Sequence, residues 1–337
     1  MRLKLSGEQT AQLGKRYTDS IKAYQLYLRG RRNSEKRSSE GFKKGAECLS
    51  EAITLDPHYA LAYAELAQCI HMPAYYGRVS PHEAYPRARE LAQNALSMDD
   101  TLAEAHDALA TVMQNYDYNW GEAEQEYKRA IQVNPNYTVA RLHYAMHLGW
   151  LGRLEEAINE AIEGQNRDPM SGIMNAGLAF ILSEARRYDW CIEQSLTAID
   201  LDPSVTFTYL GLAAAYEMKG MYYEAIATHE KSLAVGGSAA LHAAMIAHVL
   251  ATMGDYASAR EALDELHEIS KKRYLPAWSL AIVYEGLGEI QSAIQCLQTA
   301  LENRDALLVT IKVWPHFDKL RGEPAFRHIQ QRVGLPG

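Results

Sequence analysis

Small residues recur every 34 positions along most of this chain. Closely packed helices need small side chains where their axes approach, so a fixed period means that one packing unit is repeated. A spacing of this length is typical of a solenoid, in which each unit contacts only its neighbours. Three series run in parallel: Ala145, Ala179, Ala213, Ala247 and Ala281; Ala123, Ala157, Cys191, Ala225, Ala259 and Ala293; and Ala130, Gly164, Ala198, Ser232, Leu266 and Ala300.

A period of 34 with this pattern is that of the tetratricopeptide repeat (TPR), whose unit is a helix–turn–helix pair. We therefore predict an all-α fold, a right-handed superhelical α-solenoid of about eight TPR helix pairs. The solenoid would occupy residues 20–303, after a lead-in or linker over residues 1–19 and before a C-terminal cap over residues 304–337. The predicted pairs are 20–55, 60–98, 103–133, 138–167, 172–201, 206–235, 240–270 and 277–303.

The turns and loops follow the same period. Glycine occupies the turn inside a pair at Gly152, Gly220, Gly254 and Gly288, where a positive φ reverses the chain, and Arg186 replaces it once. Asp-Pro or Asn-Pro follows several second helices, because proline cannot continue one helix and suits the start of the next.

Some spacings depart from the period. Ala67 and Ala110 are 43 residues apart, which is nine more than the period. These extra residues fall in residues 71–81, which we expect to project as a loop. Ala110 lies 35 residues before Ala145, so the register of the third pair is loose by one residue. An array must cover its last apolar face, and we expect a short helix over 324–333 within the cap.

Composition argues against several classes of function. The 337-residue chain has a net charge of −8, so we expect neither nucleic acid nor membrane as a direct partner. We see no signal peptide or membrane span, which favours a cytoplasmic protein. The motifs GxxxxGK, GxGxxG and GxSxG are absent, so we predict no catalysis and no cofactor. The cysteines have neither metal nor disulfide spacing, and Cys191 reads as packing: Cys48, Cys69, Cys191 and Cys296.

Four segments resemble one bacterial class of TPR region, and the likeness covers about residues 18 to 335. They are Ala23–Arg31, Ala60–Ala67, Tyr118–Tyr127 and the ending Phe317–Phe326. In that class the repeats usually form the C-terminal half of larger regulators. The N-terminal half is a class III adenylate cyclase, a winged-helix DNA-binding domain or a Ser/Thr kinase. This sequence contains none of them, and Leu5–Thr10 resembles the join, so the resemblance implies the regulatory part of a signalling or transcription regulator.

The resemblance also implies a binding groove. In TPR arrays the first helix of each pair lines the concave face, and repeat positions 2, 5, 9, 12 and 13 point into it. In the middle pairs these positions form an apolar stripe on a face expected to be open, which suits a peptide or partner domain. The alternatives are a register error of one residue, or burial of the stripe between neighbours. The predicted groove residues are Val139, Leu142, Met146, Trp150, Ile173, Phe180, Phe207, Leu210 and Met218.

Three further candidates are weaker. A carboxylate clamp for chaperone tails needs Lys, Asn and Arg on the groove, and position 5 offers no cationic cluster. His143 and His147 share a helix face but lack a third ligand, so we predict no metal site. A basic run between Arg29 and Lys44 could contact nucleic acid or an acidic domain, but we favour a solvated helix end.

The leading hypothesis is a non-catalytic interaction module that holds a peptide or a partner domain in its groove. A second hypothesis is assembly, in which the array forms a homodimer or pairs effector domains. A third is a small-molecule sensor, in which the Tyr75–Tyr76 segment closes on a ligand.

Overall fold

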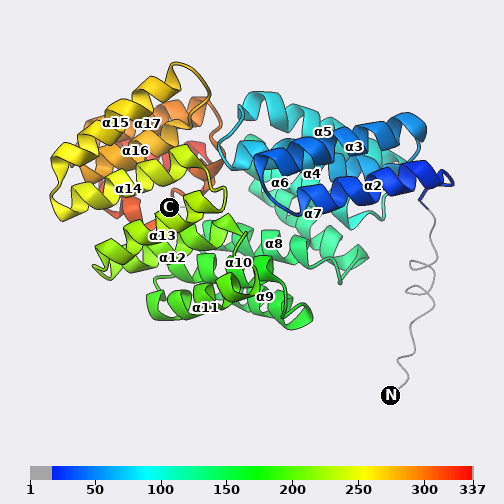
Figure 1. Cartoon of the computed structure of the whole chain (residues 1–337), viewed down its shortest axis with the longest axis horizontal. Coiled ribbons are helices and arrows are strands. Elements are labelled where there is room, and N and C mark those ends of the chain that lie inside the picture. Colours follow the sequence, from blue (N-terminus) through cyan, green and yellow to red (C-terminus); the bar gives the residue numbers. More distant parts are fainter. Residues whose placement is uncertain (1–16, 336–337) are drawn as a thin grey trace.

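The computed structural model describes residues 17–335, and every regular element in that range is helical (Figure 1). Consecutive helices pack as eight pairs, so the predicted solenoid is confirmed. The pairs are α2 (Ile21–Ser34) with α3 (Ser39–Leu55), α4 (Ala60–Tyr75) with α5 (Pro81–Met98), α6 (Ala103–Val112) with α7 (Trp120–Val133), α8 (Thr138–Trp150) with α9 (Leu154–Arg167), α10 (Gly172–Glu184) with α11 (Tyr188–Leu201), α12 (Thr206–Met218) with α13 (Tyr222–Ala234), α14 (Ala239–Met253) with α15 (Tyr256–Ser270), and α16 (Ala277–Gly286) with α17 (Ile290–Glu302).

The three series of small residues lie where helices approach closely, and every member is buried. Gly164 on α9 shows the reason, since a methyl group there would clash with the end of the Met174 side chain on α10. Cys191 is fully buried in the same kind of position, which agrees with its assignment to packing. Small side chains therefore set the distance between helix axes.

The turns inside the pairs have the backbone that the sequence predicts. Gly152 and Gly254 have φ angles of 85° and 92°, and Arg186 adopts the same left-handed region at 61°. A Cβ atom at Gly254 would meet no atom within 4 Å, so conformation rather than space favours glycine there.

The 35-residue spacing before Ala145 has a structural cause. After Val112 the first helix of the third pair continues as a π-helical turn, η1 (Met113–Asp117). A π-turn holds one more residue than an α-turn, so it absorbs one residue without moving the helices on either side. The sequence showed the extra residue, and the structure places it at the C-terminal end of this first helix.

The predicted projecting loop over residues 71–81 is wrong. Helix α4 runs through Pro73 to Tyr75, and α5 begins at Pro81, so most of the excess lengthens the two helices. The two helices have 16 and 18 residues, against 13 and 14 in the pair α8 and α9. The lengthened α4 ends at Tyr75, and Tyr76 follows it as the C-cap.

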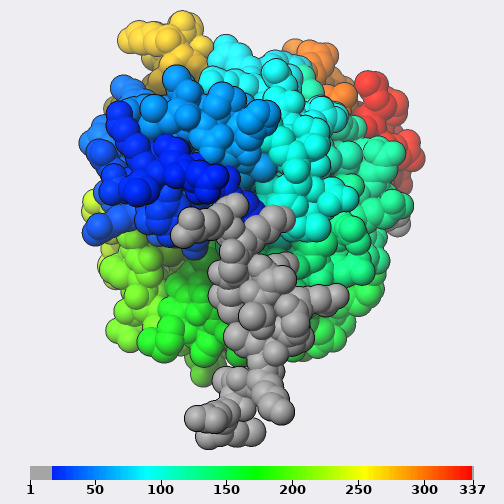
Figure 2. Space-filling model, turned by 90° about the vertical axis from the view of Figure 1, so that its right-hand side faces the viewer, coloured from blue at the N-terminus to red at the C-terminus, as the bar shows by residue number. Residues whose placement is uncertain are grey.

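The superhelix turns far enough for its second and third pairs to meet the segments that follow the sixth and eighth pairs. Arg78 donates to the Gly236 carbonyl at 3.0 Å, and Trp120 donates to the Val333 carbonyl at 2.7 Å. Figure 1 shows α14 to α17 beside the N-terminal helices, and Figure 2 shows the red C-terminal segment at the edge of the cyan and green units. The array is therefore closed on itself.

The segment after α17 contains two 3-10 helices and one α-helix: η2 (Ala306–Thr310), η3 (Pro315–Leu320) and α18 (Pro324–Arg332). The last of these confirms the short helix predicted at 324–333. Of the lead-in predicted for residues 1–19, residues 1–16 lie outside the described residues. The segment from η2 to η3, here called the inner strap (residues 306–320), turns back over the concave face.

Candidate functional site

The nine predicted groove residues lie on α8, α10 and α12, the first helices of the three middle pairs. Three of them are half-buried, namely Val139, Ile173 and Met218. The other six are buried, so the expectation of an open apolar face is wrong for them: Leu142 (2% exposed), Met146 (5%), Trp150 (2%), Phe180 (1%), Phe207 (9%) and Leu210 (4%).

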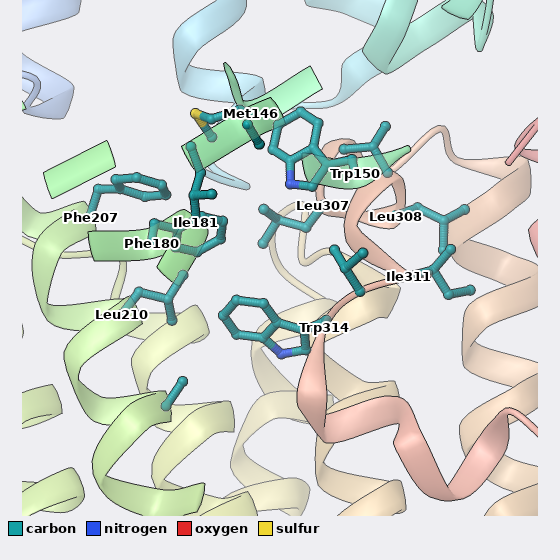
Figure 3. Packing of buried hydrophobic residues seen from close by; sticks show 14 of the residues in the cluster. Met146, Trp150, Phe180, Ile181, Phe207, Leu210, Leu307, Leu308, Ile311 and Trp314 are labelled. Carbon is teal, nitrogen blue, oxygen red and sulfur yellow. The ribbon is translucent and has the colours of Figure 1, made fainter. Parts of the chain in front are cut away.

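The inner strap covers much of this stripe (Figure 3). The ring centroids of Phe180 and Trp314 are 5.4 Å apart with the rings nearly parallel, and Phe207 lies 4.3 Å from Phe180. Leu307 and Ile311 of the strap belong to the same buried cluster. The apolar stripe thus serves largely as the seat of the chain's own C-terminal segment.

A buried polar cluster also holds the strap. Glu217 on α12 accepts hydrogen bonds from His248 on α14 at 2.7 Å and from His316 of the strap at 2.9 Å. The second nitrogen of His248 donates to Glu285 on α16 at 2.7 Å, and Lys319 lies 3.3 Å from that carboxylate. Four elements therefore meet at one set of charges.

The pKa shifts in this cluster follow from burial and charge pairing. Burial opposes protonation of His248, but the Glu217 and Glu285 carboxylates outweigh it and raise the His248 pKa to about 9. Burial likewise opposes ionisation of Glu217, but His248 and His316 lower the Glu217 pKa well below its usual range. Burial lowers the His316 pKa, so a neutral His316 donates through Nε2. Protonated His248 and Lys319 balance the two carboxylates.

The same cluster is the group in the described residues whose atoms could together ligate a cation. One ligand atom each from Glu217, His248 and His316 lies within 4.8 Å of the others. Their separations of 2.7 and 2.9 Å along the hydrogen bonds, and the balance of charge, are those of an ion-paired network. We therefore assign this cluster to the attachment of the strap.

The two histidines weighed as a metal pair have separate partners. Nδ1 of His143 lies 2.8 Å from the buried Asp107 carboxylate. Nδ1 of His147 lies 2.7 Å from Oε1 of Gln114, and its ring packs against Trp120.

An inner pocket remains beside the strap, with a volume of about 510 Å³ including its opening. It is lined by residues of α4, α6, η1, α7, α8, α10 and α12, and by Arg37 in the turn between α2 and α3. Five predicted groove residues contribute to it: Leu142, Met146, Trp150, Ile173 and Phe207. The structure thus brings these five together around one cavity.

Several polar side chains line the inner pocket, and the sequence analysis had singled out four of them for other reasons: Arg37, Tyr75, Tyr76 and His143. His71 is fully buried on α4, and neither ring nitrogen has a hydrogen-bond partner among the described residues. The buried hydroxyl of Tyr75 is also unpartnered there. Gln114 and Asn115 bond each other at 2.8 Å. The excess near residue 71 was the available signal, but a loop was expected where α4 continues.

Within residues 17–335, no helix is both long and apolar enough to cross a membrane. The prediction about a cytoplasmic location stays untested.

No family model matches the chain. It is 31% identical over 122 residues to small glutamine-rich tetratricopeptide repeat-containing protein 2 of Mycosarcoma maydis, which covers 35% of this chain and 34% of that protein. It is 23% identical over 220 residues to the transcriptional regulator HilA of Salmonella typhimurium, which covers 63% of this chain and 39% of HilA. The matches thus span about a third of the length of these relatives.

Solved structures share the architecture at low sequence identity. A monomeric mutant of IFIT1 with Gppp-AAAA is similar at a TM-score of 0.61 and 12% identity, over 87% of this chain and 67% of that one. The APC/C hetero-tetramer Cut9–Hcn1 is similar at a TM-score of 0.57 and 14% identity, over 98% of this chain and 67% of that one. Together with the 34-residue period, these likenesses show that the chain is an α-solenoid of the TPR type.

Proposed function

We propose that the chain is a non-catalytic module that binds a protein or peptide partner at its inner pocket. The observation that carries the proposal is the convergence of five first helices, from α4 to α12, on one cavity that the inner strap leaves unfilled. A partner would insert an apolar side chain there, because Met146, Trp150 and Phe207 are among the apolar residues of its wall.

We also propose that the module belongs to a larger bacterial regulator. The likeness to HilA, named a transcriptional regulator, supports this proposal and extends over 63% of this chain. The resemblance of the first and last segments to TPR regions of bacterial regulators points the same way. In such a protein, partner binding at the inner pocket would control an attached or separate effector.

The rim of the inner pocket allows a test that spares the core. Ile173 is half-buried at the start of α10, so Ile173→Glu places a carboxylate at the pocket without emptying a packed site. The wild-type chain is used to capture partners from extracts of its own organism, and the purified partner is then titrated. We expect at least about tenfold weaker binding by the variant.

Ile192→Glu on α11 is the matched control, because Ile192 is also half-buried but does not line the pocket. Equal binding by the wild type and Ile173→Glu would contradict the proposed site. Loss of binding by both variants, with helicity unchanged, would place the partner elsewhere on the array.

Assembly is a second candidate because α2 exposes one apolar face. Ile21, Tyr24 and Leu28 are 76%, 50% and 44% exposed, and their spacing places them along one side of the helix. A homodimer through this face would shift to monomer in the triple substitution to Ser, as measured by light scattering across a concentration series. A monomer for the wild type at every concentration would exclude this candidate.

A further inference from the structure

The inner pocket contains a buried polar side chain that the protein itself does not satisfy. His71 is 0% exposed, and both of its ring nitrogens lack a partner among the described residues. Burial lowers the His71 pKa to about 3, so the ring is neutral and offers one donor and one acceptor. Buried polar groups are nearly always hydrogen-bonded, so a group left unpaired at a cavity points to a ligand.

Arg37 supplies the charge of the inner pocket. Three arginines occupy turns with a positive φ, namely Arg37, Arg186 and Arg304 at 48°, 61° and 56°. The guanidinium of Arg186 binds Asp318 and the Val313 carbonyl, and that of Arg304 lies 4.5 Å from the centre of the Tyr118 ring.

Arg37 differs from the other two, because its guanidinium has no hydrogen bond or ion pair within the described residues and instead lines the pocket. A left-handed backbone is unfavourable for a side chain other than glycine, and strain of this kind is concentrated at functional sites.

A second polar side chain, His143 of α8, lines the same cavity. Nδ1 of His143 is held by Asp107, whose carboxylate is fully buried and also accepts from Gln68 at 2.9 Å. This arrangement fixes the ring, and because Nδ1–H donates to Asp107, Nε2 of the neutral ring is the acceptor available to a ligand. The Asp107 charge is shared between two donors and does not line the pocket.

The lining residues as a group favour an anion with a flat apolar body. None of the described residues that line the pocket is acidic, although the whole chain carries a net charge of −8. Aromatic rings of Tyr76, Trp150 and Phe207 form its walls, and the Trp150 indole is held in place by a 2.9 Å hydrogen bond to Glu184.

We propose that the inner pocket binds a small organic acid with a planar apolar body and a single carboxylate. Arg37 holds the carboxylate, His71 and His143 bond polar groups on the ring of the ligand, and the aromatic walls contact its body. This inference rests on the proposed use of the inner pocket as a binding site.

A small molecule and a peptide terminus can both present a carboxylate to Arg37, so the two sources have to be distinguished. Trp150, Gln114 and Asn115 are at most 2% exposed, so this part of the pocket wall is enclosed. The test therefore includes a peptide that carries the same chemistry.

Calorimetric titration of the full chain with indole-3-acetate, 4-hydroxybenzoate and 3-phenylpropionate tests the proposal. We expect at least one acid to bind with a Kd below about 1 mM, as its size permits. Its neutral amide, for example indole-3-acetamide, should bind at least about tenfold more weakly, because the charge-assisted hydrogen bonds are lost.

Arg37→Gln should weaken binding of the acid at least about tenfold, and Arg32→Gln should leave it unchanged. Arg32 is the matched control because it lies in the same basic run but is exposed and does not line the pocket. Equal affinity for acid and amide, an Arg37→Gln variant that binds like wild type, or no binding by any of the three acids would overturn the inference. Tighter binding of Gly-Ser-Gly-Phe with a free carboxylate would also overturn it, in favour of a peptide terminus.

The partner experiment separates this inference from the proposed function. If Ile173→Glu loses partner binding and the wild type binds no acid, the proposed function stands and only the inference about the organic acid fails. Acid binding that depends on Arg37, with partner capture unaffected by Ile173→Glu, would support the ligand and contradict the partner site.

Discussion

Nε2 of His316 lies 2.9 Å from Oε2 of Glu217, although the two residues are 99 positions apart in the sequence. The contact joins the inner strap to α12, and the other Glu217 oxygen accepts from His248. Both oxygens are used at a side-chain exposure of 1%. The strap is therefore held by a buried charge network as well as by apolar packing.

Glu217→Gln should destabilise the fold by about 3 kcal/mol, because it removes the carboxylate of a buried ion pair and leaves His248 facing an amide. The free energy of unfolding in urea measures the loss. Glu224→Gln on the exposed side of α13 is the control and should change stability by less than about 0.5 kcal/mol. Equal stability of the two variants would show that the network contributes nothing net.

Stability should fall as the pH rises from the ordinary histidine pKa of 6.5 through about 9. The folded pKa of His248 is raised, so its contribution is complete below pH 6.5 and is lost as the pH passes the folded value of about 9. The Glu217 pKa is lowered, so its contribution is lost only in acid and does not offset the alkaline loss. Urea unfolding at about pH 6 and about pH 9.5 should differ by up to about 3 kcal/mol.

Substitution of His248 tests whether this residue causes the pH dependence. His248→Gln should be less stable than wild type at about pH 6 and should lose most of the alkaline slope. His58→Gln, at an exposed position, should keep the wild-type slope. A slope that survives in His248→Gln would assign the pH dependence to another group.

Trp314→Ala should cost about 3–5 kcal/mol, because the indole is 1% exposed and packs between Phe180 and Trp278. The same substitution at Trp190, which is 41% exposed, should cost less than about 1 kcal/mol. Thermal unfolding by circular dichroism compares the two. The Trp314 variant should also bind a hydrophobic dye, since the strap then leaves part of the inner face uncovered; similar dye binding by both variants would contradict this.

The helix pairs could be predicted because their signal is periodic. A small residue every 34 positions is required by local helix packing alone, so Ala145 and its counterparts reveal each pair without knowledge of the rest of the chain. The one-residue excess before Ala145 was visible for the same reason and corresponds to the π-turn at Met113–Asp117.

The covered inner face could not be predicted, because its cause is a contact between distant segments. The strap lies outside the repeat, so no spacing relates Trp314 to Phe180. The polar cluster could not be predicted either, because its members occupy different positions of the repeat. Glu217 and Glu285 come four residues after the periodic alanine of their helix, whereas His248 comes one residue after it. These side chains meet only because the superhelix closes on itself.

Gly254 and Gly121 should respond to alanine in opposite directions. Gly254 ends α14 with a φ of 92°, a conformation that costs alanine about 1–2 kcal/mol, although a Cβ there would meet no atom within 4 Å. Gly121 lies in the first turn of α7 with a similarly open surrounding, so alanine should stabilise the helix by about 0.5 kcal/mol. Urea unfolding of both variants measures the difference. Because neither methyl group would meet a neighbour, a lower stability of both variants would contradict the view that backbone conformation decides the effect of alanine at Gly254 and Gly121.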